Sequence, residues 1–139
     1  YGWFQLTMAN YIEHYGLLRQ TLENGRFERC QPHHSWNNNF KASNLLTLHL
    51  QRHSDHHAHP TRAYQLLRDY ADAPQLPQGY PAMMGLALFP PAWRYVMDSR
   101  VVDWADGDMN KVNIDPAKRD EIFRKFHREA EKTEDAKAA

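Results

Sequence analysis

The sequence predicts an all-α chain, and three observations carry this prediction. Residues 3–22 place apolar side chains three or four positions apart, which is the spacing of one helix face. Residues 43–57 are rich in leucine and have no helix-breaking residue. Asp115-Pro116 has the order of a capping residue followed by proline at the first helical position.

The elements follow from these patterns in chain order. The first helix is expected from Trp3 to about Leu22, where Asn24-Gly25 would end it. A turn-rich stretch covers residues 31–39, and a second helix is expected from Ser43 to about His57.

Beyond Pro60, the chain is expected to form loops and short helices, because prolines recur at positions 74, 77, 81, 90 and 91. The longest apolar run, residues 82–96, contains Pro90-Pro91 and Arg94. It is therefore interpreted as a core or membrane-surface segment and not as a span.

Two parts of different composition are expected. Residues 1–114 form one unit, and residues 115–139 form a charged helical tail, rich in Lys, Glu and Ala, that frays into disorder and carries a solvent-facing His127. The chain starts at Tyr1 without an initiator Met, so we expect a fragment of a longer protein.

Composition excludes several classes of function. Lys plus Arg equals Asp plus Glu at 17 each, so there is no charge excess for binding nucleic acid. The single Cys30 excludes an internal disulfide and a cysteine-rich zinc or iron–sulfur site.

A cluster of histidines indicates a metal site. Residues 50–62 contain four histidines, of which His53, His56 and His57 stand at i, i+3 and i+4. On a helix these three side chains share one face and converge. Imidazole binds zinc, iron and copper, and without thiolates redox-active iron is favoured as much as zinc.

Other polar residues near the cluster are interpreted as supporting groups. Asp55 projects from the opposite helix face, so it is expected to orient a ring or to bond elsewhere. His59 precedes Pro60, which ends the helix, and a supporting role is favoured for it. His49 lies on the same face as His53, so geometry alone leaves ligation open, although a supporting role is favoured.

Three further residues could support the site from outside this cluster. His33 and His34 lie in the turn-rich stretch, where hydrogen bonds that fix the loop or a ligand are favoured over ligation. Asn10 lies one helical turn before His14 and could orient that ring.

Two long motifs resemble a known family. They are Asn-Tyr-Ile-Glu-His-Tyr-Gly-Leu at residues 10–17 and Leu-Gln-Arg-His-Ser-Asp-His-His-Ala-His-Pro at residues 50–60. Together with matching segments at 32–37, 77–81 and 102–105, they make the chain similar to the carboxy-terminal part of the bacterial membrane alkane 1-monooxygenases (AlkB-type alkane hydroxylases).

This resemblance implies a non-haem enzyme with two irons in the bacterial cytoplasmic membrane, with this portion facing the cytosol. Its iron ligands here would be His14, His53, His56 and His57. The other ligands would lie upstream of residue 1, so the fragment alone is expected to be inactive. The implied reaction converts alkanes and O2 to 1-alkanols, with electrons from rubredoxin and its reductase.

Alternatives remain open at this stage. A xylene-type hydroxylase or a fatty-acyl desaturase would share the histidine motif. A soluble zinc hydrolase would normally place a general-base carboxylate where His56 stands. A non-catalytic metal-binding module is the remaining possibility.

Overall fold

The structure, a computed structural model, describes residues 1–126. These residues form helices joined by turns and loops, with isolated β-bridges but no β-strand, so the all-α prediction is confirmed. The α-helices are α1 (Gly2–His14), α2 (Lys41–Leu46), α3 (His53–Ala58), α4 (Tyr80–Ala87) and α5 (Pro90–Trp104). The 3-10 helices are η1 (Pro32–His34), η2 (Tyr64–Leu66), η3 (Met109–Lys111) and η4 (Pro116–Lys118).

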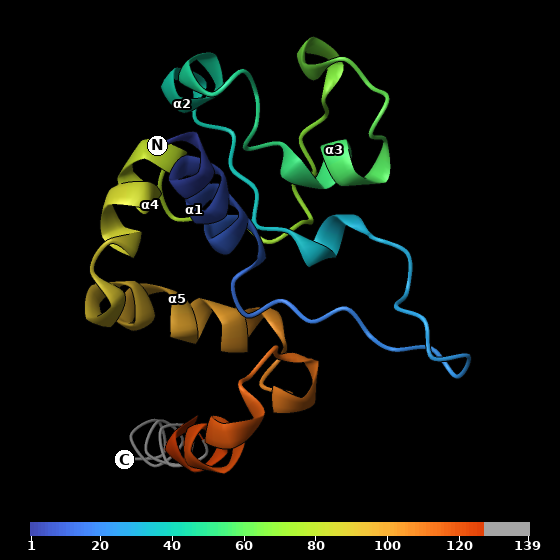
Figure 1. Ribbon diagram of the computed structural model, residues 1–139, viewed down its shortest axis with the longest axis vertical. Helices are drawn as coiled ribbons and strands as arrows, with labels where there is room; N and C mark the ends of the chain where they lie inside the picture. Colours follow the sequence, from blue (N-terminus) through green and yellow to red (C-terminus); the bar gives the residue numbers. More distant parts are fainter. Residues whose placement is uncertain (127–139) are drawn as a thin grey trace, which may run out of the picture.

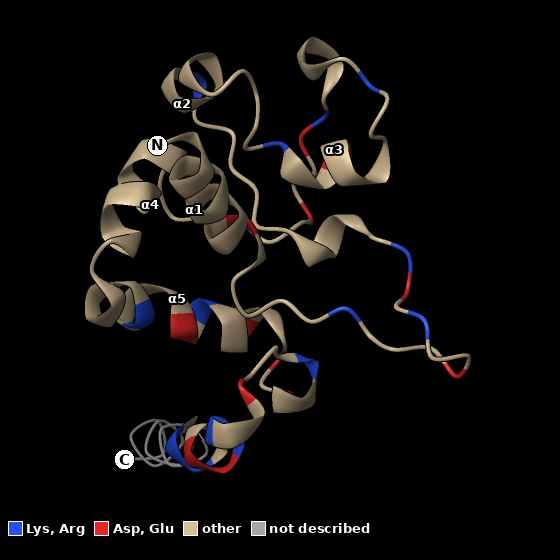
Figure 2. Ribbon diagram, viewed as in Figure 1, with Lys and Arg blue, Asp and Glu red and all other residues tan. Residues whose placement is uncertain are grey.

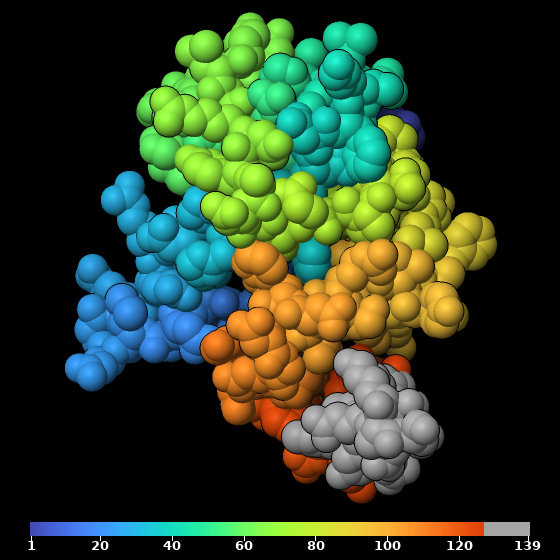
Figure 3. Space-filling view, turned by 180° about the vertical axis from the view of Figure 1, so that it is seen from behind, coloured from blue at the N-terminus to red at the C-terminus, as the bar shows by residue number. Residues whose placement is uncertain are grey.

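The core lies between α1, α4 and α5. Figure 1 shows α1 and α4 side by side, with α5 running across their ends. Seen from behind, α5 forms a band across the middle of the molecule (Figure 3). The buried side chains that meet there are Ile12, Trp36, Leu76, Tyr80, Met83, Trp93, Met97, Val101, Ala105, Met109 and Val112.

Prolines begin the two core helices instead of breaking them. Pro81 lies in the first turn of α4, and Pro90 and Pro91 open α5. In the first turn of a helix the backbone N–H groups have no acceptor within the helix, so proline loses no hydrogen bond there, and its fixed φ suits the helical conformation. The expectation of only short helices after Pro60 was therefore wrong for α5, which runs for 15 residues.

The first helix ends at His14, eight residues before its predicted end. Tyr15, with φ −56° and ψ 119°, leaves the helical conformation, and Gly16 has a φ of +71°, which other residues adopt at a cost. A Cβ on Gly16 would lie 2.6 Å from a methyl group of Val101, so the chain must turn here to pack against α5. The following residues, 17–31, form a loop that projects from the body (Figure 1).

The predicted single helix over residues 43–57 is two short helices. Leu48 and His49 have φ values of +51° and +61°, a left-handed turn that separates α2 from α3. The amide of His49 donates to the carbonyl of Asn44. Leu45 and Leu46 are exposed, so the leucines of this stretch do not form one buried stripe.

The capping prediction at Asp115-Pro116 is confirmed. The Asp115 carboxylate accepts from the Ala117 amide at 3.0 Å, and the 3-10 turn η4 continues as helix through Phe126. Most of the predicted charged tail, including His127, lies outside the described residues.

Several large apolar side chains of the described region face outward. Trp3, Phe4 and Leu6 of α1 and Tyr95 of α5 are exposed. Within residues 1–126, no helix is both long and apolar enough to cross a bilayer.

Candidate metal centre

His14 is the last residue of α1, and its ring is oriented by the chain that follows. Its Nδ1 lies 3.0 Å from the carbonyl oxygen of His34. A carbonyl only accepts, so Nδ1 carries the proton and donates it. The Nε2 of His14 is therefore left with a free lone pair, which is the state that a metal ligand requires.

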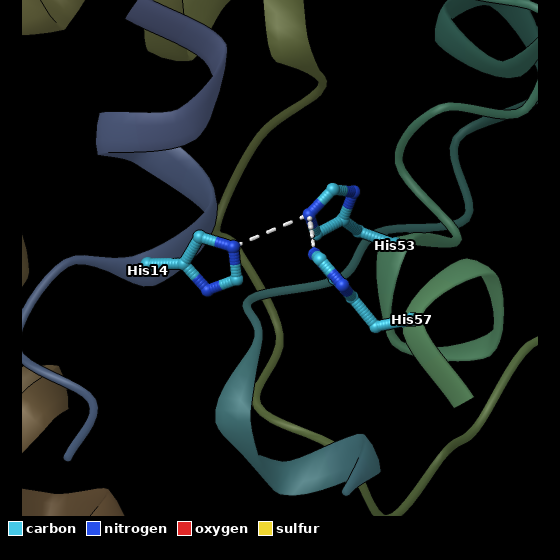
Figure 4. A group of neighbouring side chains, drawn as sticks. All are labelled: His14, His53 and His57. Carbon is cyan, nitrogen blue, oxygen red and sulfur yellow. Dashed lines mark hydrogen bonds between the residues drawn. The ribbon is translucent and has the colours of Figure 1, made fainter. Parts of the chain in front are cut away.

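His53 and His57 face His14 from the first and second turns of α3. The Nε2 atoms of His53 and His57 are 2.7 Å apart, and Nε2 of His53 lies 3.3 Å from Nε2 of His14 (Figure 4). The i, i+4 spacing on α3 brings the first pair together, and the tertiary fold supplies the third ring.

The start of α3 is held in place by the segment before α2. The Asn37 side chain accepts from the Ser54 amide at 3.0 Å, and the Ser54 hydroxyl donates to the carbonyl of Pro32. These contacts join α3 to η1, whose last residue, His34, also holds His14. The segment from Pro32 to Asn37 therefore sets the distance between His14 at the end of α1 and the two histidines of α3.

The three rings fit a divalent metal ion. When two nitrogens bind the same ion at about 2.1 Å, with a nitrogen–metal–nitrogen angle between near 90° and tetrahedral, they lie roughly 2.7–3.4 Å apart. The two Nε2 separations fall in this range, and the three nitrogens all lie within 4.8 Å of one another. We call His14, His53 and His57 the histidine trio.

The surroundings of the trio favour its neutral form, most strongly at His53, which is buried, whereas His14 is half-buried and His57 is exposed. Burial, together with His57, His14 and His56 nearby, lowers the pKa of His53 to about 2. The pKa values of His14 and His57 are also lowered, in both cases chiefly by burial. Neutral imidazole is the form that binds metal, so little proton competition is expected at neutral pH.

His56 does not join the trio. Its ring centroid is 6.0 Å from that of His53 and 5.9 Å from that of His57, and its nitrogens do not join the group in which the other three meet. The predicted convergence of His53, His56 and His57 on one point therefore holds for two of the three.

Asp55 was expected either to orient a ring or to bond elsewhere, and its hydrogen bonds are made to residues outside the trio. It is fully buried and accepts from His59, the Arg68 amide, the Tyr70 hydroxyl and, by an ion pair, Arg62. Burial raises the pKa of Asp55, but these hydrogen bonds outweigh it and hold the pKa below its usual value. His59 is thus part of a loop-fixing network.

Two other candidates are placed apart from the trio. The Nδ1 of His49 lies 3.1 Å from the carbonyl of Tyr64, because the left-handed turn directs this ring away from His53. Asn10 is exposed, and within residues 1–126 it makes no hydrogen bond to His14.

His33 and His34 belong to a second group with metal-binding residue types. Ligand atoms of Glu28, His33 and His34 all lie within 4.8 Å of one another. However, Nδ1 of His34 accepts from the Gln31 amide at 3.0 Å, so its proton is on Nε2, which lies 3.0 Å from the Glu28 carboxylate. His34 is therefore occupied as a loop-fixing residue and has no lone pair for a metal.

Sequence reasoning gave Glu13 no role, although it lies at the centre of the site. Its Oε2 is 3.2 Å from Nε2 of His53, and its Oε1 accepts from the Tyr80 hydroxyl at 3.0 Å. Burial raises the pKa of Glu13 to about 7, although the bond from Tyr80 opposes this. The sequence did carry a signal for Glu13. It follows Ile12 directly and lies four residues after Ala9, and both of those apolar residues are on the buried face of α1.

A cavity of about 650 Å³ adjoins His14. It lies between α1, α5 and the residues around η4, and its lining mixes apolar side chains such as Val102 and Ile114 with the polar Asp98. Of the trio, only His14 lines this cavity.

Comparison with known proteins identifies the relatives of this chain. The fatty acid desaturase family matches residues 1–87. The chain is 61% identical over 126 residues to alkane 1-monooxygenase 1 of Alcanivorax borkumensis and 60% identical to alkane 1-monooxygenase of Ectopseudomonas oleovorans. Each match covers 91% of this chain and 31% of the relative, so the chain spans about a third of their length.

A more distant relative is the xylene/toluene monooxygenase hydroxylase component XylM of Pseudomonas putida, which is 30% identical over 99 residues. That match covers 68% of this chain and 24% of the relative. The resemblance to alkane 1-monooxygenases read from the motifs is confirmed. With its helical fold and its histidine trio, the chain belongs to the fatty acid desaturase family.

Proposed function

We propose that this chain is the iron-binding part of an alkane 1-monooxygenase, which hydroxylates the terminal methyl group of alkanes. The observation that carries the proposal is the meeting of three Nε2 atoms from two motifs 39 residues apart. Both motifs lie within the match to relatives named alkane 1-monooxygenase.

The proposed metal is a pair of iron ions. His14, His53 and His57 would hold one of them. We assign His56 to the second, because its ring lies on the same helix but does not share the meeting point of the trio. Bound iron would supply the redox chemistry with O2, which nitrogen ligands and open coordination positions permit.

The residues of the chain have their own tasks in this scheme. The trio presents neutral nitrogens, the His34 carbonyl fixes the tautomer of His14, and the buried segment 34–38 fixes the distance between α1 and α3. The supporting roles predicted for Asn10, His49 and His59 are not part of this proposal, because their contacts lie elsewhere.

This chain cannot itself hold the iron site of an electron-donating rubredoxin. Cys30 is the only cysteine, and a rubredoxin-type iron site needs four thiolates. We therefore propose rubredoxin, reduced by its own reductase, as the donor. The protein would act at the cytosolic side of the bacterial inner membrane, where the exposed apolar residues of α1 fit a non-aqueous environment.

The test is a chimaera in which this chain replaces the matching third of the Alcanivorax borkumensis relative. Iron content and conversion of octane to 1-octanol are measured with rubredoxin and its reductase supplied. His57→Ala should lose iron and alcohol formation, whereas the matched control His49→Ala should retain both. An active His57→Ala chimaera would overturn the proposal.

The product separates the proposed reaction from its alternatives within the family. A benzylic alcohol from xylene, or an alkene from a fatty acyl chain, with no 1-octanol, would favour the xylene-type or desaturase activity. Zinc in place of iron would favour the hydrolase or the metal-binding module.

A further inference from the structure

Glu13 is a buried carboxylate on a helix that has no other charged side chain. Residues 2–14 contain no Lys, Arg or Asp, and α1 is nearly free of charge in Figure 2. The Glu13 residue is 3% exposed. Burying an ionised carboxylate is costly unless it is paired or lies against a metal, so this position calls for a partner.

The contacts of Glu13 leave one side of it directed at the histidine trio. Oε1 accepts from the Tyr80 hydroxyl, which comes from α4, and Oε2 lies 3.2 Å from Nε2 of His53. The backbone carbonyl of Glu13 accepts from the Trp36 amide at 2.8 Å, so the last turn of α1 is fixed. Among the described residues, no Lys or Arg pairs with this carboxylate.

His53 provides the link between carboxylate and metal. Its Nε2 is the nitrogen that faces both other members of the trio, and an ion bound to it at about 2.1 Å would lie within roughly 5 Å of Oε2 of Glu13. Three imidazoles are neutral and compensate none of the charge of a dication. A carboxylate in this position does so, and because Glu13 is buried, the attraction between the two charges is stronger than it would be in water.

We propose that Glu13 is the anionic partner of the metal bound by the histidine trio, and that the Tyr80 hydroxyl positions it. This rests on the proposed metal site. Glu13→Gln is close to isosteric and retains a hydrogen-bonding oxygen, so it removes the charge and little else. Asp98→Asn is the matched control, because Asp98 also accepts from a tyrosine, Tyr15, at 2.7 Å, but is not a neighbour of His53.

The experiment is a titration of the full chain and of the chimaera with Co²⁺, followed by visible absorption. Glu13→Gln should weaken Co²⁺ binding about 10- to 100-fold, Tyr80→Phe less than about tenfold, and Asp98→Asn less than about twofold. Co²⁺ affinity of Glu13→Gln within twofold of the unchanged chain, with the same spectrum, would overturn the proposal.

Thermal unfolding separates this role from a purely structural one. Without metal, Glu13→Gln should unfold at the same or a higher temperature, and only the rise in Tm on adding Co²⁺ should shrink. A lower Tm without metal and an unchanged rise would show a structural role and contradict the proposal. If Glu13→Gln does not fold, Tyr80→Phe serves as the test. Weaker Co²⁺ binding by Tyr80→Phe would support the proposal, and unchanged binding would contradict it.

The outcome also separates this inference from the proposed function. If neither the unchanged chain nor the chimaera binds Co²⁺, both fail. If they bind Co²⁺, His57→Ala abolishes binding and Glu13→Gln does not weaken it, the metal site stands and only the role of Glu13 is lost.

Discussion

The chain has two groups of residues of metal-binding type, the histidine trio and the group of Glu28, His33 and His34. They differ in which ring nitrogen of a key histidine carries the proton. In the trio, Nδ1 of His14 donates to a carbonyl, so Nε2 is free to bind a metal. In the group of Glu28, His33 and His34, Nδ1 of His34 accepts from a backbone amide, so Nε2 carries the proton. For His14 and His34, one hydrogen bond to Nδ1 decides whether Nε2 offers a lone pair or carries the proton.

The two groups are also physically joined. The carbonyl of His34 is the acceptor that fixes His14, so the group of Glu28, His33 and His34 sets the tautomer of one member of the proposed metal site. Fixing the far ring nitrogen of a ligand is a common way to orient it and to raise its basicity. The comparison can be tested by disturbing each group in turn.

The largest effect is expected from removing a member of the trio. His53→Ala should weaken Co²⁺ binding by more than about 100-fold, since even residues that only orient a ligand account for 10–100-fold. His33→Ala, in the other group, should change it less than twofold, as seen by the same absorption titration. Equal losses from the two variants would contradict the distinction between the groups.

The turn that connects the groups can be broken at Gly16. Gly16→Ala should lower the free energy of unfolding by about 2–4 kcal/mol, because φ is positive and the new Cβ would overlap Val101. Gly25→Ala is the control, since its φ is also positive but nothing lies within 4 Å, and about 1 kcal/mol is expected there. Urea unfolding measures both.

The structural group should affect stability more than metal binding. His34→Ala removes a buried ring that accepts from the Gln31 amide, and a loss of about 1–3 kcal/mol is expected in urea unfolding. His34→Asn can place an acceptor near the Nδ1 position and should recover part of this loss. A loss of Co²⁺ affinity as large as that of His53→Ala would instead make His34 a ligand.

The smallest effect concerns pH in the metal-free chain. The folded-state pKa of His53 is lowered to about 2, so the unfolded state binds more protons below pH 6.5 and stability falls as the pH falls. Glu13 acts in the opposite direction, because its pKa is raised to about 7 and the folded state takes up its proton first between pH 7 and 4.5.

Glu13→Gln should therefore steepen the loss of stability between pH 6.5 and 4.5, by at most about 1.4 kcal/mol per pH unit. Unfolding in urea at several pH values measures the slope, with Asp98→Asn as the control. A slope unchanged by Glu13→Gln would mean that folding does not raise the pKa of this carboxylate.

Much of the site could be predicted from local sequence. His53 and His57 are four residues apart on a helix, and that spacing alone brings their nitrogens together. The capping pattern at Asp115-Pro116 predicted the start of the last helix, because capping depends on neighbouring residues only. The long motifs around His14 and His53 predicted the relatives.

Other features depend on contacts between distant segments. The first helix ends at His14 because Gly16 packs against Val101, 85 residues further along the chain, and no local rule contains that contact. The helix expected over residues 43–57 is interrupted at Leu48 and His49, which moves His49 away from the face it would have shared with His53.

The sequence by itself determined the helical class, the histidines that could bind a metal and the family, because these depend on residue type and short-range spacing. Only the tertiary structure decided which of those histidines meet, which nitrogen of His14 and of His34 carries the proton, and that Glu13 lies beside His53. A ring's tautomer is set by partners in other segments, and so is the environment of a buried carboxylate.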